Sequence, residues 1–262
     1  MQRLMTKCLS RFLLGFLCVL AVGSAAAIAA CAGDGPASTS LGSASTSLAV
    51  GASESVSFTT DDGVTLSGNL FGSGTSGVVL AHMYPADQTS WYPTAERLAE
   101  EGYLVLTFDF RGYGDSQGTK QIEYLDRDMV AALAEIGAAG ATEVALIGAS
   151  MGGTAGLIAA SQTPAPVPIA GVATLSAPVE FKGLSAAEAV PQLKVPLLFI
   201  AAEDDAGADG ARELQKLATV ESELELIPGD EHGTDLLEGP HGEQVWELLA
   251  GFVQQVLPAT GD

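Results

Sequence analysis

The fold is decided by the stretch Gly148-Ala149-Ser150-Met151-Gly152-Gly153, which lies where an apolar strand pattern, residues 143–148, gives way to small helix-forming residues, 154–160. A serine with glycines two positions before and two after it is typical of a sharp turn from strand to helix. Such a turn strains the serine backbone and exposes its hydroxyl at the carboxyl edge of the sheet. The glycines are needed because side chains there would collide with the neighbouring strand or helix. The alternative is an ordinary tight turn whose serine only caps the next helix.

Outward from this turn, strand and helix patterns alternate. A hairpin is expected over Ser55–Thr60 and Val64–Phe71, around the turn signal Asp61-Asp62-Gly63. Continuous apolar runs, typical of strands buried on both faces of a mainly parallel sheet, follow at Gly77–His82, Tyr103–Phe108, Val144–Gly148, Val172–Leu175, Val195–Ala201 and Leu224–Ile227. Helical patterns occur at Thr94–Glu100, Ile122–Ala138, Thr154–Ala160, Ala208–Ala218 and Gly242–Val256. The alternation predicts an α/β fold with a doubly wound, mainly parallel sheet and an antiparallel N-terminal hairpin.

The first 31 residues differ from the rest of the chain. Three basic residues lie in the first eleven positions, and the stretch Phe12–Ala30 is apolar and free of charge, as in an export signal. It ends in Ile28-Ala29-Ala30-Cys31, which resembles the bacterial lipobox. In proteins with that motif the cysteine is lipidated and becomes the mature N-terminus. We therefore expect residues 1–31 to be a lipoprotein-type signal peptide with its lipidation site at Cys31.

The cysteine count fits this interpretation. Cys8 and Cys18 lie inside the signal, so Cys31 would be the single thiol of the mature protein, which excludes an intramolecular disulfide. Residues 32–53 are mostly Ser, Thr, Gly and Ala and predict a flexible tether. The expected location is the membrane, facing outside the cytoplasm. Cleavage by the ordinary signal peptidase near Ala25–Ala30, giving a secreted protein, and an uncleaved membrane anchor are the alternatives.

Composition and charge narrow the function classes. With 262 residues and 47% hydrophobic content, the chain can bury one large core, which we assign to a single domain over residues 54–262. Eight basic and all 32 acidic residues follow residue 31, an excess of 24 negative charges that argues against nucleic acid or an anionic lipid surface as partner. Neither a cysteine and histidine cluster nor a Gly-rich dinucleotide turn is present, so no metal and no cofactor is expected.

Residues 54–256 resemble the α/β-hydrolases, and two stretches outside the serine turn carry the likeness. Asp109-Phe-Arg-Gly-Tyr-Gly-Asp-Ser116 looks like the family's turn after its fourth strand. The resemblance implies that Asp109 and Arg111 hold that loop rather than perform chemistry. Leu80-Ala-His-Met-Tyr-Pro-Ala-Asp-Gln88 is similar to small bacterial members of the dienelactone-hydrolase-like and esterase-like kind.

Ser150 needs a base within hydrogen-bond reach and a third group to orient that base. In this fold the chain order is serine, acid, histidine. The resemblance implies that the base lies in the loop after the last strand, which makes His232 the expected base. The resemblance implies a structural role for His82, beside the oxyanion loop. His241, at the start of the final helix, is expected to be a surface or capping residue. The alternative for His232 is a solvated loop histidine.

The acid is expected in Glu203-Asp204-Asp205, which follows the predicted strand at 195–201. Similar hydrolases place the catalytic aspartate at the position that aligns with Asp205. Asp204 is the alternative, because one residue of register decides which side chain points at His232. The acid should stay ionised and fix the imidazole tautomer, while the unused carboxylates face solvent.

Backbone N–H groups are expected to form the oxyanion hole. One belongs to Met151, after the nucleophile, and the other to Met83 or Tyr84, where Met83 replaces the glycine commoner in the family. Tyr84 could instead reach the substrate pocket, with Trp91 and Tyr92 as candidate walls. Aromatic residues in such positions are at least as often part of the core.

The segment Ala177–Lys194 is short where larger relatives insert a helical lid, and it predicts one short helix at most. An open site disfavours a lipase of long-chain fats. Taken together, the sequence predicts a serine hydrolase of carboxylesterase type, which cleaves small-molecule esters or thioesters through an acyl-enzyme. A peptidase or amidase on the same fold, and a non-catalytic cell-surface binding lipoprotein, are the alternatives.

Overall fold

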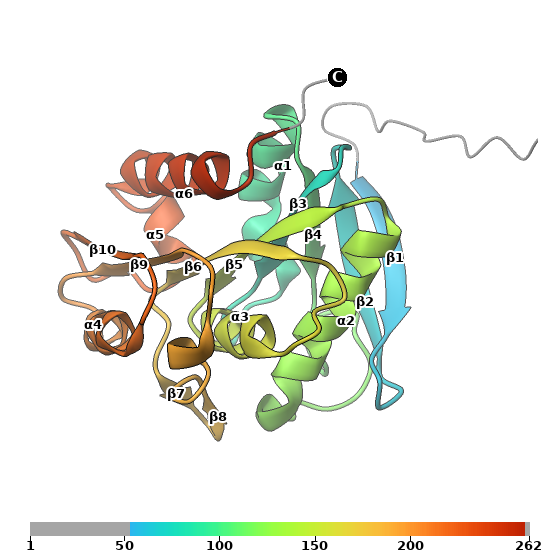
Figure 1. Cartoon of the computed structure of the whole chain (residues 1–262), viewed down its shortest axis with the longest axis horizontal. Helices are drawn as coiled ribbons and strands as arrows, with labels where there is room; N and C mark the ends of the chain where they lie inside the picture. Colours follow the sequence, from blue (N-terminus) through green and yellow to red (C-terminus); the bar gives the residue numbers. More distant parts are fainter. Residues whose placement is uncertain (1–52, 260–262) are drawn as a thin grey trace, which may run out of the picture. The chain divides into compact units, whose positions relative to one another are not determined.

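The computed structural model describes residues 53–259, which form an eight-stranded sheet in the order β1-β2-β4-β3-β5-β6-β9-β10, with helices on both faces (Figure 1). The strands are β1 (Ser53–Thr59), β2 (Thr65–Phe71), β3 (Ser76–Ala81), β4 (Leu104–Phe108), β5 (Glu143–Ala149), β6 (Ile169–Leu175), β9 (Leu197–Ala202) and β10 (Ser222–Ile227). The helices are α1 (Tyr92–Glu100), α2 (Leu125–Ala138), α3 (Met151–Ser161), α4 (Gly207–Leu217), α5 (Asp235–Glu238) and α6 (Gly242–Val256).

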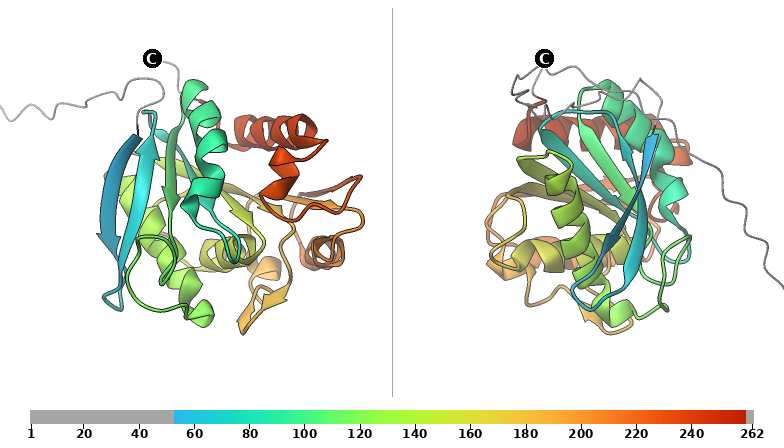
Figure 2. Two further views of the ribbon diagram at one scale, coloured as in Figure 1. Left: turned by 180° about the vertical axis from the view of Figure 1, so that it is seen from behind. Right: turned by 90° about the vertical axis from the view of Figure 1, so that its right-hand side faces the viewer.

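The sheet begins antiparallel and continues parallel, as the sequence predicts. Strand β1 pairs antiparallel with β2, and β2 pairs antiparallel with β4, whereas every later pairing is parallel. The turn between β1 and β2 includes Gly63, whose φ of +85° lies in the left-handed region that suits glycine. Figure 2 (right) looks onto this edge of the sheet, with β1 and β2 in front. The predicted hairpin is therefore confirmed.

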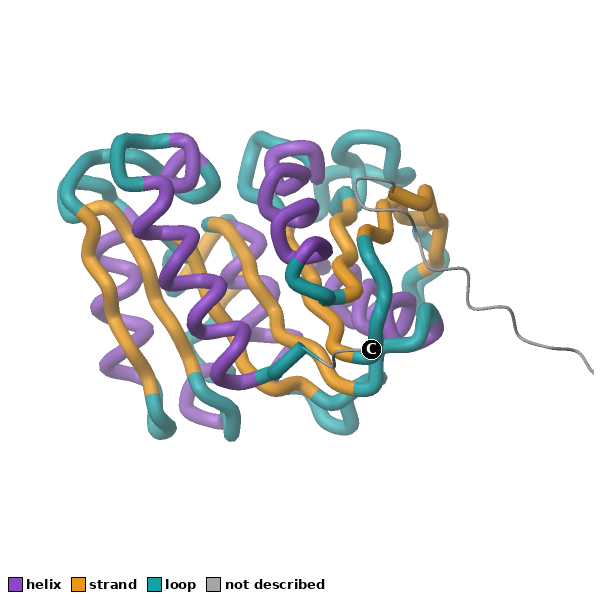
Figure 3. Tube along the Cα trace, turned by 90° about the horizontal axis from the view of Figure 1, so that it is seen from above, coloured by secondary structure: helices purple, strands orange, loops and turns teal. Residues whose placement is uncertain are grey.

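Helices α1 and α6 cover one face of the sheet, and α2, α3 and α4 cover the other (Figure 1). Figure 3 shows α6 running alongside the strands that it covers. Consecutive residues of a strand point to opposite faces. In β3, Val78 accordingly belongs to the core that contains Leu98 of α1, and Val79 to the core that contains Met129 of α2. This explains why the central strands are continuous apolar runs.

Three details differ from the sequence prediction. Strand β10 is half-buried rather than buried on both faces, because it is the last strand of the sheet and only β9 pairs with it. Helix α3 begins at Met151, three residues before the predicted start, because the helix follows the serine turn directly. The helix predicted over Ile122–Ala138 opens with a 3₁₀ turn, Ile122–Tyr124, before α2.

The segment between β6 and β9 holds no large lid. It contains a two-stranded hairpin, β7 (Glu180–Phe181) and β8 (Leu184–Ser185), and one 3₁₀ turn at Val190–Gln192. The prediction of one short helix at most is confirmed, whereas the hairpin was not predicted, because two-residue strands leave no alternation to detect. Within residues 53–259 the helices are too short or too polar to cross a membrane. The predicted signal and its lipidation site at Cys31 lie outside the described residues.

Candidate active site

Ser150 occupies the strained turn that the sequence predicts between β5 and α3. Its φ and ψ are +46° and −114°, a conformation that is costly for a residue with a side chain. A Cβ at Gly148 would meet the backbone of Gly152 at 2.5 Å, and one at Gly152 would meet the carbonyl oxygen of Ala81 at 2.5 Å. The glycines are thus sterically required. Ser150 makes no side-chain cap to α3, so the simple capping alternative is wrong.

The structure brings Ser150, His232 and Asp205 into one hydrogen-bonded row. The Oγ of Ser150 lies 2.8 Å from Nε2 of His232, and Oδ2 of Asp205 lies 2.8 Å from Nδ1 of the same ring. An ionised carboxylate only accepts hydrogen bonds, so Nδ1 carries the proton and Nε2 is left to accept from the serine hydroxyl. Ser150 is 5% exposed, so its hydroxyl lies recessed rather than exposed as the sequence suggested.

The register of the loop after β9 selects Asp205 over Asp204. The N–H of Glu203 donates to Ile227 O at 2.8 Å and that of Asp204 donates to Gly229 O at 3.0 Å, which extends the β9–β10 pairing. The next residue, Asp205, turns toward His232, and its side chain is 9% exposed. Glu203 and Asp204 face solvent, as expected for the unused carboxylates. The alternative acid, Asp204, is therefore not part of the row.

The loop that carries His232 packs against the loop after β3. Gly233 has a φ of +59°, and a Cβ there would meet the sulfur of Met83 at 2.5 Å and the Cβ of Ala149 at 3.5 Å. Gly233 therefore lies close to both the Met83 side chain and Ala149, the residue before Ser150. The carbonyl of His232 also accepts the N–H of Asp235 at 3.1 Å, at the start of α5. These contacts hold the imidazole where the serine can reach it.

The oxyanion hole was expected to use two backbone N–H groups, one of Met151 and the other of either Met83 or Tyr84. Met151 begins α3 and is buried, while Met83 and Tyr84 lie in the loop after β3. Within residues 53–259 none of these three N–H groups has a hydrogen-bond acceptor. Unpaired donors beside a nucleophile are what an oxyanion hole requires.

His82 holds the loop after β3 in place through two hydrogen bonds. Its ring is fully buried, Nδ1 donates to the carbonyl of Met83 at 2.9 Å, and Nε2 accepts the N–H of Phe110 at 3.1 Å. These partners require one proton on the ring, at Nδ1. Burial lowers the pKa of His82, which agrees with a neutral imidazole. The structural role implied by the resemblance fits these contacts.

Asp109 ties the loop after β3 to the loop after β4. Its carboxylate accepts the backbone N–H and the side-chain amide of Gln88, each at 2.9 Å, and the N–H of Asp115 at 3.1 Å. Gln88 is 4% exposed, and sequence reasoning gave it no role. A polar residue inside an otherwise loop-like stretch carries no signal of burial. Asp109 holds the loop, as the resemblance implies.

Arg111 is fully buried and bridges the β1–β2 turn to α2. Its guanidinium donates to Asp62 at 2.8 and 3.0 Å and to Asp128 at 2.8 Å. Burial opposes the charge of Arg111, but these carboxylates outweigh it and raise the pKa of the guanidinium. Hydrogen bonds from Arg111 lower the pKa of Asp62, whereas burial raises the pKa of Asp128 despite the same partner. The loop-holding role expected for Arg111 is met here.

The structure gives different outcomes for the remaining aromatic residues and for His241. Trp91 is fully buried in the core, so its assignment as a pocket wall is wrong. Tyr92 packs on the ring of Phe71 and receives a hydrogen bond from Asn69 of β2, which also makes it part of the packing. Tyr84 is 41% exposed. His241 occupies the N-cap position of α6 but makes no side-chain cap.

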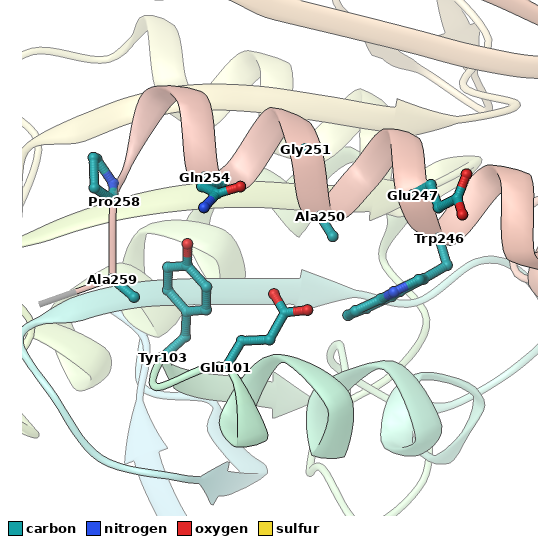
Figure 4. Close-up of a pocket in the computed structure, with 9 residues that line it drawn as sticks. All are labelled: Glu101, Tyr103, Trp246, Glu247, Ala250, Gly251, Gln254, Pro258 and Ala259. Atoms are coloured by element: carbon teal, nitrogen blue, oxygen red, sulfur yellow. The ribbon is translucent and has the colours of Figure 1, made fainter. Parts of the chain in front are cut away.

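A groove of about 500 Å³ lies away from this row of side chains, between the end of α1 and helix α6. Figure 4 shows Tyr103 and Glu101 facing side chains of α6 across it. Because Tyr103 precedes β4, the groove is at the amino edge of the sheet, opposite Ser150. Among residues 53–259 no group of three or more His, Cys, Asp or Glu side chains could hold a metal ion.

Comparison with known proteins agrees with this architecture. A family model for the α/β hydrolase fold matches residues 78–190. An esterase from Pyrococcus furiosus is similar in structure, with a TM-score of 0.66, 20% identity, and coverage of 79% of this chain and 90% of that one. An esterase from Exiguobacterium antarcticum has a TM-score of 0.66 and 17% identity over 77% of this chain and 100% of its own. No curated protein matches the chain in sequence.

A third similar structure, a thermophilic esterase from Thermogutta terrifontis, has a TM-score of 0.62 and 20% identity, over 79% of this chain and all of its own. At such identities the likeness shows the fold. Over residues 53–259 the protein thus has an α/β fold with a doubly wound sheet and no large lid. The chain has the α/β-hydrolase fold.

Proposed function

We propose that this chain is a serine hydrolase of carboxylesterase type, which cleaves small-molecule carboxylic esters or thioesters through an acyl-enzyme on Ser150. The observation that carries the proposal is the pair of 2.8 Å contacts that link Ser150 to His232 and His232 to Asp205. The esterases among the similar structures support the same reaction class.

In this mechanism the Oγ of Ser150 attacks the ester carbonyl carbon while Nε2 of His232 takes the hydroxyl proton. Asp205 accepts from Nδ1, keeps the ring in the required tautomer and stabilises the imidazolium that forms. The turn that carries Ser150 is strained and packs closely around its flanking glycines. The hydroxyl is therefore already positioned for attack before the substrate binds. Little reorganisation is needed for attack.

The tetrahedral intermediate carries a negative oxygen, which the N–H of Met151 and a second N–H from Met83 or Tyr84 would stabilise. The imidazolium of His232 then protonates the leaving alcohol or thiol, and the acyl group stays on Ser150. Water, deprotonated by the same nitrogen, attacks the acyl-enzyme and releases the acid. No cofactor is required for any of these steps.

A fluorophosphonate probe tests the proposal directly, because it phosphonylates only an activated serine. We expect stoichiometric labelling of the full chain in detergent, abolished by Ser150→Ala and unchanged by Ser57→Ala, which removes an exposed serine of β1. A folded protein that is not labelled would favour the non-catalytic binding protein instead.

A panel of nitrophenyl esters and matching nitroanilides separates esterase from amidase activity. The segment 177–194 forms a small hairpin and one 3₁₀ turn rather than a lid, which supports an open site and a preference for short acyl chains. A clear optimum at long chains would contradict the open site. Faster turnover of the anilides than of the esters would favour the peptidase or amidase.

We also propose that the protein is a lipoprotein, anchored to the membrane through Cys31 and facing outside the cytoplasm. The support is the lipobox-like Ile28-Ala29-Ala30-Cys31 at the end of an apolar signal. Metabolic labelling with an alkyne fatty acid should mark the wild-type protein and not Cys31→Ala. A secreted, unlabelled wild-type protein would indicate ordinary signal cleavage.

A further inference from the structure

Three aromatic rings and two lysines gather beside the candidate active site. The ring of Tyr84 lies 6.4 Å from that of Tyr113 and 5.8 Å from that of Phe181. The Nζ of Lys182 is 3.8 Å from the centre of the Tyr84 ring, and that of Lys120 is 4.0 Å from the centre of the Tyr113 ring. We call these five residues the lysine–aromatic patch.

The patch is connected to the nucleophile through two contacts. The hydroxyl of Tyr113 lies 3.7 Å from the sulfur of Met151, the residue that follows Ser150. Tyr84 follows Met83, whose side chain lies against Gly233, next to His232. Burial raises the pKa of Tyr113 to about 12, so this ring stays neutral. The patch therefore adjoins both the serine turn and the loop after β3.

The two lysines keep their charges unpaired. Residues 53–259 contain four arginines, and each forms an ion pair with a carboxylate: Arg97, Arg111, Arg127 and Arg212. Within the same residues none of the four lysines has a carboxylate partner, although carboxylates outnumber basic side chains by 30 to eight, and Lys120 and Lys182 are the two that lie on aromatic rings. Both are exposed and lie over ring faces, which hold an ammonium group without neutralising it.

Lys182 occupies a backbone position that disfavours it. With Gly183 it forms the two-residue loop between β7 and β8, and their φ values are +48° and +91°. Such a loop favours Asn, Asp or Gly at its first position, because a longer side chain is strained there. The hairpin lies next to α3, the helix that begins after Ser150 (Figure 1). A functional role for the Lys182 ammonium group would explain why a strained residue occupies this position.

We propose that the lysine–aromatic patch binds a carboxylate on the substrate, so that the preferred substrates are esters whose acyl or alcohol part carries one negative charge. This inference rests on the proposed ester hydrolysis. The rings would contact the apolar part between the scissile ester and the carboxylate, and Lys120 and Lys182 would pair with the charge. A singly charged group fits better than a phosphate dianion, because the net negative charge of the domain repels polyanions.

The test compares matched esters that differ in one charge. For the acyl side the pair is 4-nitrophenyl hydrogen glutarate and its neutral methyl ester, and for the alcohol side it is 4-acetoxybenzoate and its methyl ester. We expect kcat/KM to favour the anionic member of at least one pair. In the Lys120→Gln/Lys182→Gln variant this ratio should fall on the order of fivefold or more, while turnover of neutral esters persists.

The control is Lys194→Gln/Lys216→Gln, which removes the same charge from two exposed lysines outside the patch. The control should keep the ratio within about twofold. An unchanged ratio in the patch variant, or an equal fall in the control, would overturn the inference while leaving the esterase proposal intact. Faster turnover of 4-acetoxyphenyl phosphate than of 4-acetoxybenzoate would overturn the choice of a carboxylate.

A binding measurement keeps the inference testable without turnover. Calorimetric titration of Ser150→Ala with monomethyl glutarate, which carries one negative charge, should show binding that is lost when Lys120→Gln/Lys182→Gln is added, and kept when Lys194→Gln/Lys216→Gln is added. Absence of monomethyl glutarate binding to Ser150→Ala overturns the inference. Failure of the esterase proposal is seen separately, as absence of fluorophosphonate labelling and of turnover of every ester.

Discussion

The backbone N–H of Ser150 donates to the carbonyl oxygen of Leu175 at 2.7 Å, which joins the serine turn to the carboxyl end of β6. The next residue, Ser176, repeats the pattern, because its N–H donates to Ile200 O of β9 at 2.7 Å. The loop that carries Asp205 follows β9. The serine turn and the strand that precedes the acid are therefore joined by backbone bonds across three neighbouring strands.

Asp205→Asn is expected to lower kcat by about a thousandfold or more, because an amide can present its NH₂ to the ring and favour the wrong tautomer. The change is nearly isosteric, so the free energy of unfolding should change little. Initial rates with a short-chain nitrophenyl ester, together with a denaturant titration, measure the two effects separately.

Asp204→Asn is the matched control, because the neighbouring carboxylate is exposed and its side chain makes no contact with His232. We expect its kcat to stay within about threefold of wild type. A large loss in Asp204→Asn with little loss in Asp205→Asn would mean that the acid in solution is the alternative one.

The serine turn was predictable because its cause is local. Gly148 and Gly152 approach backbone atoms so closely that only glycine fits. Both glycines are visible in the sequence, two positions from Ser150. The expected base could be predicted for a different reason, since the chain has three histidines and only His232 lies in the loop directly after the last strand, whereas His241 lies at the start of the final helix. The choice of Asp205 over Asp204 depended on the resemblance, because the β9–β10 pairing that decides it is not visible in the sequence.

Other features depend on contacts between distant segments and leave no local pattern. Ser176 is fully buried with a φ of +55°, and a Cβ at Gly207 would meet its Cβ at 2.6 Å. Gln88 is buried because Asp109, from another loop, binds it. The lysine–aromatic patch likewise combines residues of the loops after β3 and β4 with residues of the β7–β8 hairpin. These positions depend on contacts that exist only in the assembled sheet, so the sequence alone does not predict them.

Gly152→Ala is expected to destabilise the fold by about 2 kcal/mol or more, because its Cβ would lie 2.5 Å from the carbonyl oxygen of Ala81 and 2.6 Å from that of His82. Both atoms are backbone, so they cannot move away without shifting β3. Fluorophosphonate labelling of Ser150 should fall as well, because the serine turn shifts with the helix. Denaturant titration measures the stability.

Gly156→Ala provides the control on the same helix. A Cβ there would lie 3.7 Å from the Met129 side chain, which is an ordinary contact. We expect this variant to be more stable by about 0.5 to 1 kcal/mol, because alanine favours the helix interior. Equal effects of the two substitutions would contradict the steric account of the serine turn.

Arg111→Met should cost about 3 to 5 kcal/mol of stability, because it leaves the fully buried carboxylate of Asp128 without its cation. The paired variant Arg111→Met/Asp128→Leu removes both charges and should recover part of the loss. Thermal and denaturant unfolding of the three proteins measure this, and the double variant being the least stable would contradict the argument.

Arg212→Met is the exposed counterpart, because the Arg212 side chain is 41% exposed and its partner Asp209 is 94% exposed. Screened surface pairs contribute little, so we expect a change below about 0.5 kcal/mol. The contrast between Arg111 and Arg212 separates burial from charge.

His82 should make the fold less stable in mild acid. Burial lowers its pKa in the folded protein below the ordinary value of 6.5, while the unfolded chain keeps that value. Below pH 6.5 the unfolded state therefore binds a proton that the folded state does not bind, and the free energy of unfolding falls as the pH falls. The contribution of this one group approaches about 1.4 kcal/mol per pH unit between 6.5 and the lowered pKa of the folded protein.

The measurement is the free energy of unfolding between pH 7.5 and 5.5 for wild type and His82→Gln. Carboxylates that titrate in both proteins cancel in the difference between the two curves. We expect wild type to lose more stability than His82→Gln over this window, although the variant starts from a lower value because the bond to the Met83 carbonyl is changed. His241→Gln, at a half-buried position without a cap, should run parallel to wild type. Parallel curves for wild type and His82→Gln would show that the buried ring takes up its proton without unfolding.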